Sequence, residues 1–197
     1  MHVKASRRLS QALSEGDGIS IIASVADATS ARAAADEGAD CVALVPGQLS
    51  TPLDTDLPVL YRGRIEDAAG VEADACLLEL HRIGDDEDEL LRIAAVARAL
   101  GLELVVDVAD DDELQIALDI LDPEVFLLSP RAAHDEAEAL EHVLDLLPDI
   151  PAGKLAIASL NVSSREQIVA LERAGFDAVL VGPGSVAGLA GGEPPTV

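Results

Sequence analysis

The chain has 197 residues, a length that fits one domain, and its 37 acidic and 13 basic residues give a formal net charge of −24. Hydrophobic residues make up 49% of the chain but aromatic residues only 2%, so the core must be built from alanine, valine, leucine and isoleucine. This aliphatic content excludes an acidic disordered tail. The acidity argues against binding to nucleic acid or to an anionic membrane, because both need basic patches.

Location and surface chemistry follow from the same sequence. No apolar run reaches the roughly 18–20 residues of a membrane-spanning helix. Because Met1–Ala5 has no apolar signal core, we expect a cytoplasmic protein. The acids are spread over the whole chain, which favours adaptation to a high-salt (halophilic) host over a dedicated surface for a basic partner. Cys41 and Cys76 stand singly in apolar runs, which indicates buried thiols and neither a disulfide nor a metal site.

Short aliphatic runs and amphipathic segments alternate along the chain. The runs are continuous, as in strands of a parallel sheet that is covered on its outer face. The eight predicted strands are Ile19–Val25, Cys41–Val45, Pro58–Tyr61, Ala75–Leu80, Leu102–Val108, Val125–Leu128, Leu155–Ala158 and Ala178–Val181. Acids or serines at the starts and glycines at several ends predict helices between them. These helices are Ser30–Glu37, Asp85–Ala99, Asp111–Leu118, His134–Leu147 and Ser163–Ala174.

This alternation implies right-handed βαβ units and an α/β fold. Eight strands predict a compact (βα)8 TIM barrel, with a doubly wound open sheet as the alternative. Since such barrels usually need about 250 residues, we expect shortened or missing helices 2, 3 and 8. Pro46–Leu57 and Glu66–Val71 are too short for full helices, and a glycine-rich segment follows Val181. The prediction is one domain over residues 1–197, with an N-terminal helical extension at 1–17 and a flexible tail at 186–197.

Four motifs resemble those of one enzyme family. Gly101–Leu114 (GLELVVDVADDDEL) is similar to the pattern G-L-x-x-L-V-E-V-H-x-x-x-E-L, and Pro58–Ile65 (PVLYRGRI) is similar to P-V-L-x-K-D-F-I. Ser163–Gly182 is similar to a seventh helix and eighth strand, and Ile22–Ala26 lies where the family has I-A-E-x-K. Over about residues 9–188 the chain therefore resembles indole-3-glycerol-phosphate synthase, the (βα)8 lyase of tryptophan biosynthesis.

The resemblance implies a reaction that closes an indole ring with loss of carbon dioxide and water. It also implies a lysine general acid and supporting carboxylates, and here the chain departs from the family. Arg62 stands in place of the third-strand lysine, and Asp107 in place of the fifth-strand glutamate. The other departures are Ser24, Ala26, Ala109, Leu128–Pro130 and Ala158–Val162, whereas Arg131 and Gly182 are retained.

These departures weaken the expectation of the family reaction on chemical grounds. Arginine stays protonated up to about pH 12, so it donates protons poorly near neutrality, whereas lysine can be tuned. Shortening a glutamate to Asp107 moves its carboxylate by roughly an ångström, which costs on the order of a hundredfold in a positioned site. Lys154 begins the seventh strand, at the end of the barrel away from active sites, and Lys4 precedes the first strand.

Even without the family resemblance, several residues that could do chemistry lie at the predicted carboxyl ends of the strands. Asp107 interrupts an apolar strand and is the first catalytic candidate, with Arg62 as the second. Arginine forks suit a phosphate or a carboxylate, but the arginines after strands are equally expected if they only pair with nearby acids. We expect a phosphate or substrate site, with backbone N–H groups and hydroxyls, at Arg131, Ser129, Asn161, Gly182, Gly184 and Ser185.

The sequence contains neither a metal-ligand cluster nor a nicotinamide motif, so we expect no metal and no cofactor. Two classes of function remain. In the first, the barrel acts on or binds a phosphorylated small molecule, either as the family's carbon–carbon lyase in weakened form or with a changed reaction. In the second, it is a pseudoenzyme that serves as a ligand-binding or scaffolding partner. Sectors without full helices also predict a homodimer contact.

Overall fold

The computed structural model describes residues 7–16, 18–45 and 52–189. Eight parallel strands form a closed barrel in chain order, with β8 paired to β1. This confirms the predicted barrel and excludes the open doubly wound sheet. The strands are β1 (Ser20–Val25), β2 (Cys41–Leu44), β3 (Val59–Tyr61), β4 (Ala75–Glu79), β5 (Glu103–Val108), β6 (Val125–Leu128), β7 (Leu155–Ser159) and β8 (Ala178–Val181).

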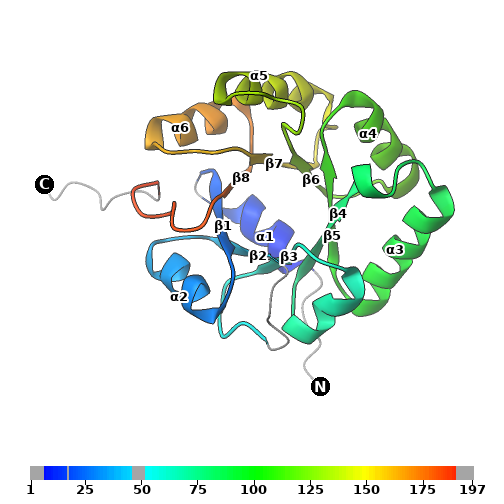
Figure 1. Ribbon diagram of the computed structural model, residues 1–197, viewed down its shortest axis with the longest axis horizontal. Coiled ribbons are helices and arrows are strands. Elements are labelled where there is room, and N and C mark those ends of the chain that lie inside the picture. The colour runs from blue at the N-terminus through cyan, green and yellow to red at the C-terminus, as the bar shows by residue number, and fades with distance from the viewer. Residues whose placement is uncertain (1–6, 17, 46–51, 190–197) are drawn as a thin grey trace, which may run out of the picture.

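Helices surround the strands, and α1 lies across the centre of the view in Figure 1. The α-helices are α1 (Arg8–Glu15), α2 (Ala28–Asp36), α3 (Glu87–Leu100), α4 (Asp111–Ile116), α5 (Glu136–Leu146) and α6 (Arg165–Ala174). Short 3-10 helices are η1 (Ile65–Val71), η2 (Leu80–Arg82) and η4 (Leu147–Asp149), and one π turn, η3 (Ala117–Leu121), continues α4.

In the described residues, helices are short or absent where the sequence predicts it. Between β3 and β4 the chain makes only the 3-10 helix η1. The described residues between β2 and β3 and those from 182 to 189 contain no helix, and residues 46–51 lie outside the described part. At the start of the expected tail, Val186 and Leu189 are buried and Arg165 Nη1 donates to the Leu189 carbonyl over 3.3 Å. Residues 190–197 are not described.

The apolar runs are continuous because both faces of each strand are buried. One set of side chains fills the barrel interior, among them Leu60, Val105 and Ile157, which are fully buried. The alternating set faces the helices and includes Val106 and Phe126. The interior is therefore a packed core and not a channel, as expected for a barrel of this strand number.

Helix α1 closes the amino end of the barrel. Leu9 and Leu13 of this helix belong to the interior core and are 0% and 3% exposed. The Glu103 carboxylate, at the start of β5, accepts hydrogen bonds from the backbone N–H groups of Leu9 and Ser10 at 2.6 and 3.0 Å. These bonds satisfy two N–H groups that have no partner inside the helix. With the amino end plugged, the carboxyl end remains as the accessible mouth.

Acidic residues at helix starts act as caps. Asp86, Asp110 and Asp135 precede α3, α4 and α5, and each side chain accepts a backbone N–H from the first turn. Helix α6 is followed by Gly175, which has a φ of 109° that other residues rarely adopt. The acidic clusters are thus helix caps and solvated first turns, as predicted. In the described part of the chain, no helix has the length and apolar character needed to cross a membrane.

Candidate functional site

Strand alternation places a set of polar residues at the carboxyl end of the barrel interior. Leu77 and Val105 belong to the interior core, and two positions further on, Glu79 and Asp107 are register partners on β4 and β5. The other residues at inward positions of this end are Ser24, Val45, Arg62, Ser129, Ser159 and Gly182. The mouth therefore combines one buried acid, one arginine, three hydroxyls and a glycine with the half-buried Glu79.

Asp107 lies at this mouth with a carboxylate that is only partly satisfied. The residue is 5% exposed, and its Oδ2 lies 3.1 Å from Arg131 Nη1. Its Oδ1 has no hydrogen-bond partner among the described residues. Burial raises the pKa of the Asp107 carboxyl above its ordinary value, and the nearby Ser129 hydroxyl and Arg131 guanidinium oppose this without cancelling it. Asp107 therefore has one buried carboxylate oxygen that no described donor satisfies.

Arg131 is held by a second carboxylate. Its Nη2 forms an ion pair with Glu113 of α4, and the same Glu113 oxygen accepts the Ala109 N–H at 2.8 Å. Glu113 was not among the predicted site residues. The signal was present, because Glu113 stands three residues after the helix cap Asp110, the spacing of a capping box. Arg131 therefore has two carboxylate partners, as in the alternative that arginines after strands only pair with nearby acids, and its phosphate contact stays a prediction.

The remaining arginines of this end differ in their partners. Arg82 Nε lies 2.9 Å from Glu79 Oε2, and Arg64 Nε lies 3.8 Å from Glu66 Oε2. Arg62, at the inward position after β3, has no carboxylate within ion-pair distance among the described residues. In so acidic a chain, an arginine at the mouth without such a partner is a candidate anion contact.

A cavity of about 560 Å³ lies beside Arg62, between η1 and α3. Tyr61 and Gly63 line it, and a Cβ atom at Gly63 would lie 2.6 Å from the Tyr61 ring. Only glycine lets the backbone pass this close to the ring. Gly63 therefore fixes the path of the chain immediately after Arg62.

The predicted phosphate residues do not all gather in one place. Gly182, Gly184 and Ser185 lie together in the loop after β8, where the Ser185 N–H donates to the Gly182 carbonyl over 3.3 Å. Gly184 has a φ of 72°, and an added Cβ would meet nothing within 4 Å, so the backbone there is open to approach. Ser129 is 8% exposed and stands beside Asp107.

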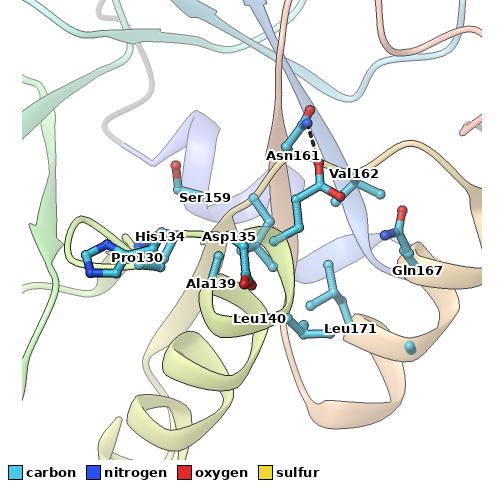
Figure 2. Close-up of a pocket in the computed structure, with 14 residues that line it drawn as sticks. Pro130, His134, Asp135, Ala139, Leu140, Ser159, Asn161, Val162, Gln167 and Leu171 are labelled. Carbon is cyan, nitrogen blue, oxygen red and sulfur yellow. Dashed lines mark hydrogen bonds between the residues drawn. The ribbon is translucent and has the colours of Figure 1, made fainter.

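Asn161 points elsewhere. Its Nδ2 donates to Glu136 Oε1 at 2.8 Å, and both side chains line a cavity between α5 and α6 (Figure 2). The N–H groups of Ser163 and Ser164, near the start of α6, donate to Gln167 Oε1 at 2.9 and 3.2 Å. The β7 side of the predicted phosphate site is therefore occupied by contacts within the protein.

Proton-transfer groups other than Asp107 are few at the mouth. Lys154 lies at the amino end, where its Nζ lies 2.6 Å from Asp122 Oδ1 and also donates to the Asp122 carbonyl. Lys4 lies outside the described residues, and His81 is exposed. In residues 7–16, 18–45 and 52–189, no group of three or more histidine, cysteine or acidic side chains is arranged to hold a metal ion.

Comparisons with known proteins identify a matching family model and a related sequence. The model of the family described as indole-3-glycerol phosphate synthase matches residues 58–186. The indole-3-glycerol phosphate synthase of Variovorax paradoxus (strain S110) is 35% identical over 133 residues, which are 64% of this chain and 49% of that protein. This chain thus spans about half the length of that curated relative.

A solved structure supports the fold. The N-acetylmannosamine-6-phosphate 2-epimerase of Clostridium perfringens is similar with a TM-score of 0.68, over 84% of this chain and 87% of that chain. Its sequence identity is 13%, so the likeness concerns the fold alone.

Proposed function

Because this chain belongs to the indole-3-glycerol phosphate synthase family, we propose that the mouth of its barrel binds a phosphorylated small molecule. The observation that carries the proposal is Arg62, an arginine at an inward position of the mouth with no carboxylate partner among the described residues. An arginine fork binds a carboxylate or a phosphate through two parallel hydrogen bonds. Among the described residues at inward positions of the mouth, Arg62 is the one basic side chain.

The loop after β8 supplies the second half of the proposed site. Gly182, Gly184 and Ser185 offer open backbone and a hydroxyl on the other side of the mouth from β3. Such glycine loops after the last strands of a barrel suit phosphate. We assign the phosphate to this loop and a second anionic group of the ligand to Arg62. Asp107 lies on β5, between these strands in the sheet order, and supplies the buried carboxyl group of the site.

We expect the barrel to bind this ligand but not to convert it rapidly. Arg62 occupies the place of the family's lysine general acid, and an arginine side chain is a poor proton donor near neutrality. Asp107 is the mouth's one buried carboxylate among the described residues, and its raised pKa suits proton transfer. We propose that any lyase activity is slow and depends on Asp107.

A second candidate function is a non-catalytic barrel that serves as a scaffold. The observation that favours it is the position of Lys154, which is committed to Asp122 at the end of the barrel opposite the mouth. No lysine among the described residues replaces the family's general acid. A scaffold would keep the fold and lose the ligand.

Thermal unfolding in concentrated potassium chloride tests the proposal. The ligand is a sugar-phosphate anthranilate, and inorganic phosphate at matched ionic strength is the control. A ligand present at about 100 times its dissociation constant adds roughly 2.7 kcal/mol of stability. We expect this shift in the unmodified chain and its loss in Arg62→Gln.

The matched variant is Arg98→Gln, which removes the same charge from the last turn of α3, at the amino end of the barrel. It should keep the ligand shift. The proposed site is wrong if the unmodified chain shows no stabilisation by the ligand beyond that by inorganic phosphate, or if both variants lose the stabilisation equally. Either result would favour the scaffold function.

A further inference from the structure

A second cavity, of about 360 Å³, lies between α5 and α6, beside the carboxyl ends of β6 and β7, and Ser159 of the mouth is among its lining residues (Figure 2). Its walls are mainly apolar, with Ala139 and Leu140 from α5, Leu171 from α6, and Val162 from the loop between β7 and α6. Cavities that hold small molecules in proteins measure about 300–1,000 Å³ and are lined mostly by apolar groups. This cavity therefore has the size and the lining of a small-molecule site.

Carboxylates form the polar edge of the cavity. Glu136 Oε1 accepts a hydrogen bond from the Asn161 amide at 2.8 Å, as Figure 2 shows. No described residue donates to the other oxygen, Glu136 Oε2. Asp135 Oδ1 accepts the N–H groups of Ala137 and Glu138, both at 2.9 Å, and leaves Oδ2 without a partner in the described part of the chain. Two carboxylate oxygens thus remain available at the edge.

The helix ends beside the cavity do not reverse this negative character. Both α5 and α6 begin here, and each N-terminus carries roughly half a positive charge. Their N–H groups are largely used, however. Asp135 takes two at the start of α5, Gln167 takes those of Ser163 and Ser164 just before α6, and Ser164 Oγ takes the Gln167 N–H in the first turn of α6.

The lining residues include no lysine or arginine. An anion would therefore meet two carboxylates with few donors left to bind it. A cation would meet carboxylate oxygens that still lack partners.

We propose that this cavity is a second ligand site, which takes a small molecule with an apolar body and a protonated amine. The body lies between Leu140 and Leu171, and the ammonium group reaches Glu136 and Asp135. This ligand class is opposite in charge to the anion proposed for the mouth. The two sites are therefore separable by experiment.

Isothermal titration calorimetry with two probes of similar size tests the proposal. Phenethylamine carries the ammonium group, and 3-phenylpropionate carries a carboxylate on the same ring. The measurement is made at pH 8, where histidine side chains carry little charge, and at low ionic strength, where charges are weakly screened. We expect one site for phenethylamine, with 3-phenylpropionate weaker by at least about threefold, the scale of an exposed ion pair.

Variants assign the binding to this cavity. Glu136→Gln should weaken phenethylamine by about two- to fivefold, because it removes one exposed charge. Glu141→Gln is the matched control, since it removes the same charge from an exposed position on the same helix. It corrects for the general attraction of a cation to an acidic chain, and it should leave the affinity unchanged.

Filling the cavity gives an independent readout. Ala139→Leu should abolish phenethylamine binding, whereas Arg62→Gln at the mouth should not affect it. Equal affinity for the two probes, or equal effects of Glu136→Gln and Glu141→Gln, would overturn the assignment of an amine. Absence of phenethylamine binding to the unmodified chain would overturn the site itself.

Discussion

The guanidinium of Arg131 lies 3.1 Å from the Asp107 carboxylate, yet this ion pair satisfies only one of the two carboxylate oxygens. The pair is unequal in its surroundings, because the Asp107 side chain is 7% exposed and the Arg131 side chain 27%. Arg131 also divides its charge between Asp107 and Glu113. Burial therefore outweighs the attraction, and the pKa of Asp107 is raised.

The raised pKa predicts that Asp107→Asn stabilises the protein at neutral pH. A carboxyl with a folded pKa above its unfolded pKa binds its proton more tightly in the native state. Its contribution to stability is present at low pH and is lost as pH rises from the ordinary aspartate value through the raised one. Asparagine resembles the protonated form, so the variant keeps that contribution at pH 7. The measurement is the melting temperature against pH in concentrated potassium chloride.

The control for this prediction is Glu141→Gln, an exposed charge removal on α5. It accounts for the general relief of repulsion in a chain with a net charge of −24. The melting temperatures of Asp107→Asn and of the unmodified chain should converge as the pH falls. A variant that melts below the unmodified chain at pH 7 would mean that the Arg131 pair outweighs the burial.

The strands were predictable from sequence because they are buried on both faces. The runs Val125–Leu128 and Ala178–Val181 match β6 and β8 at both ends. The helix starts were predictable for a local reason, since each cap involves residues two or three apart, such as Asp110 and Glu113.

The side-chain partners of the site residues were harder to predict from sequence. Asn161 and Glu136 are 25 residues apart, and their hydrogen bond depends on how two loops leave neighbouring strands. Arg131 reaches Glu113 across 18 residues for the same reason. Residue type and strand position placed these polar groups at the carboxyl end of the barrel. They did not determine which polar groups already have partners, and so which remain for a ligand.

Both cysteines should be unreactive in the native protein. Burial raises the pKa of the Cys41 and Cys76 thiols to about 12, with nearby carboxylates adding to the effect. The reactive species is the thiolate, and at pH 8 it is then only about one part in ten thousand of each thiol. A chromogenic disulfide reagent should therefore detect no fast thiol in the native chain and two after unfolding.

Glutathione in the same assay shows that the reagent is active. Cys76 is the more demanding test, because it lines the cavity beside Arg62 although the residue is only 2% exposed. One rapid thiol in the native chain would show that this cavity opens to the reagent and that burial does not protect the sulfur.

The plug at the amino end should be essential to stability. Leu9 of α1 is 0% exposed inside the barrel core, and Leu9→Ala should lower the free energy of unfolding by about 2–5 kcal/mol, the range for leucine truncation in a core. Leu91 of α3 is 47% exposed, so Leu91→Ala, the same chemical change, should stay within about 0.5 kcal/mol. Urea unfolding at one fixed potassium chloride concentration measures both free energies, because urea adds no ionic strength to the solution of an acidic chain.

Similar losses in the two variants would mean that α1 does not contribute to the barrel core in solution. The amino end of the barrel would then not be closed by α1. A loss confined to Leu9→Ala would support the closed amino end, and with it the placement of ligand chemistry at the opposite mouth.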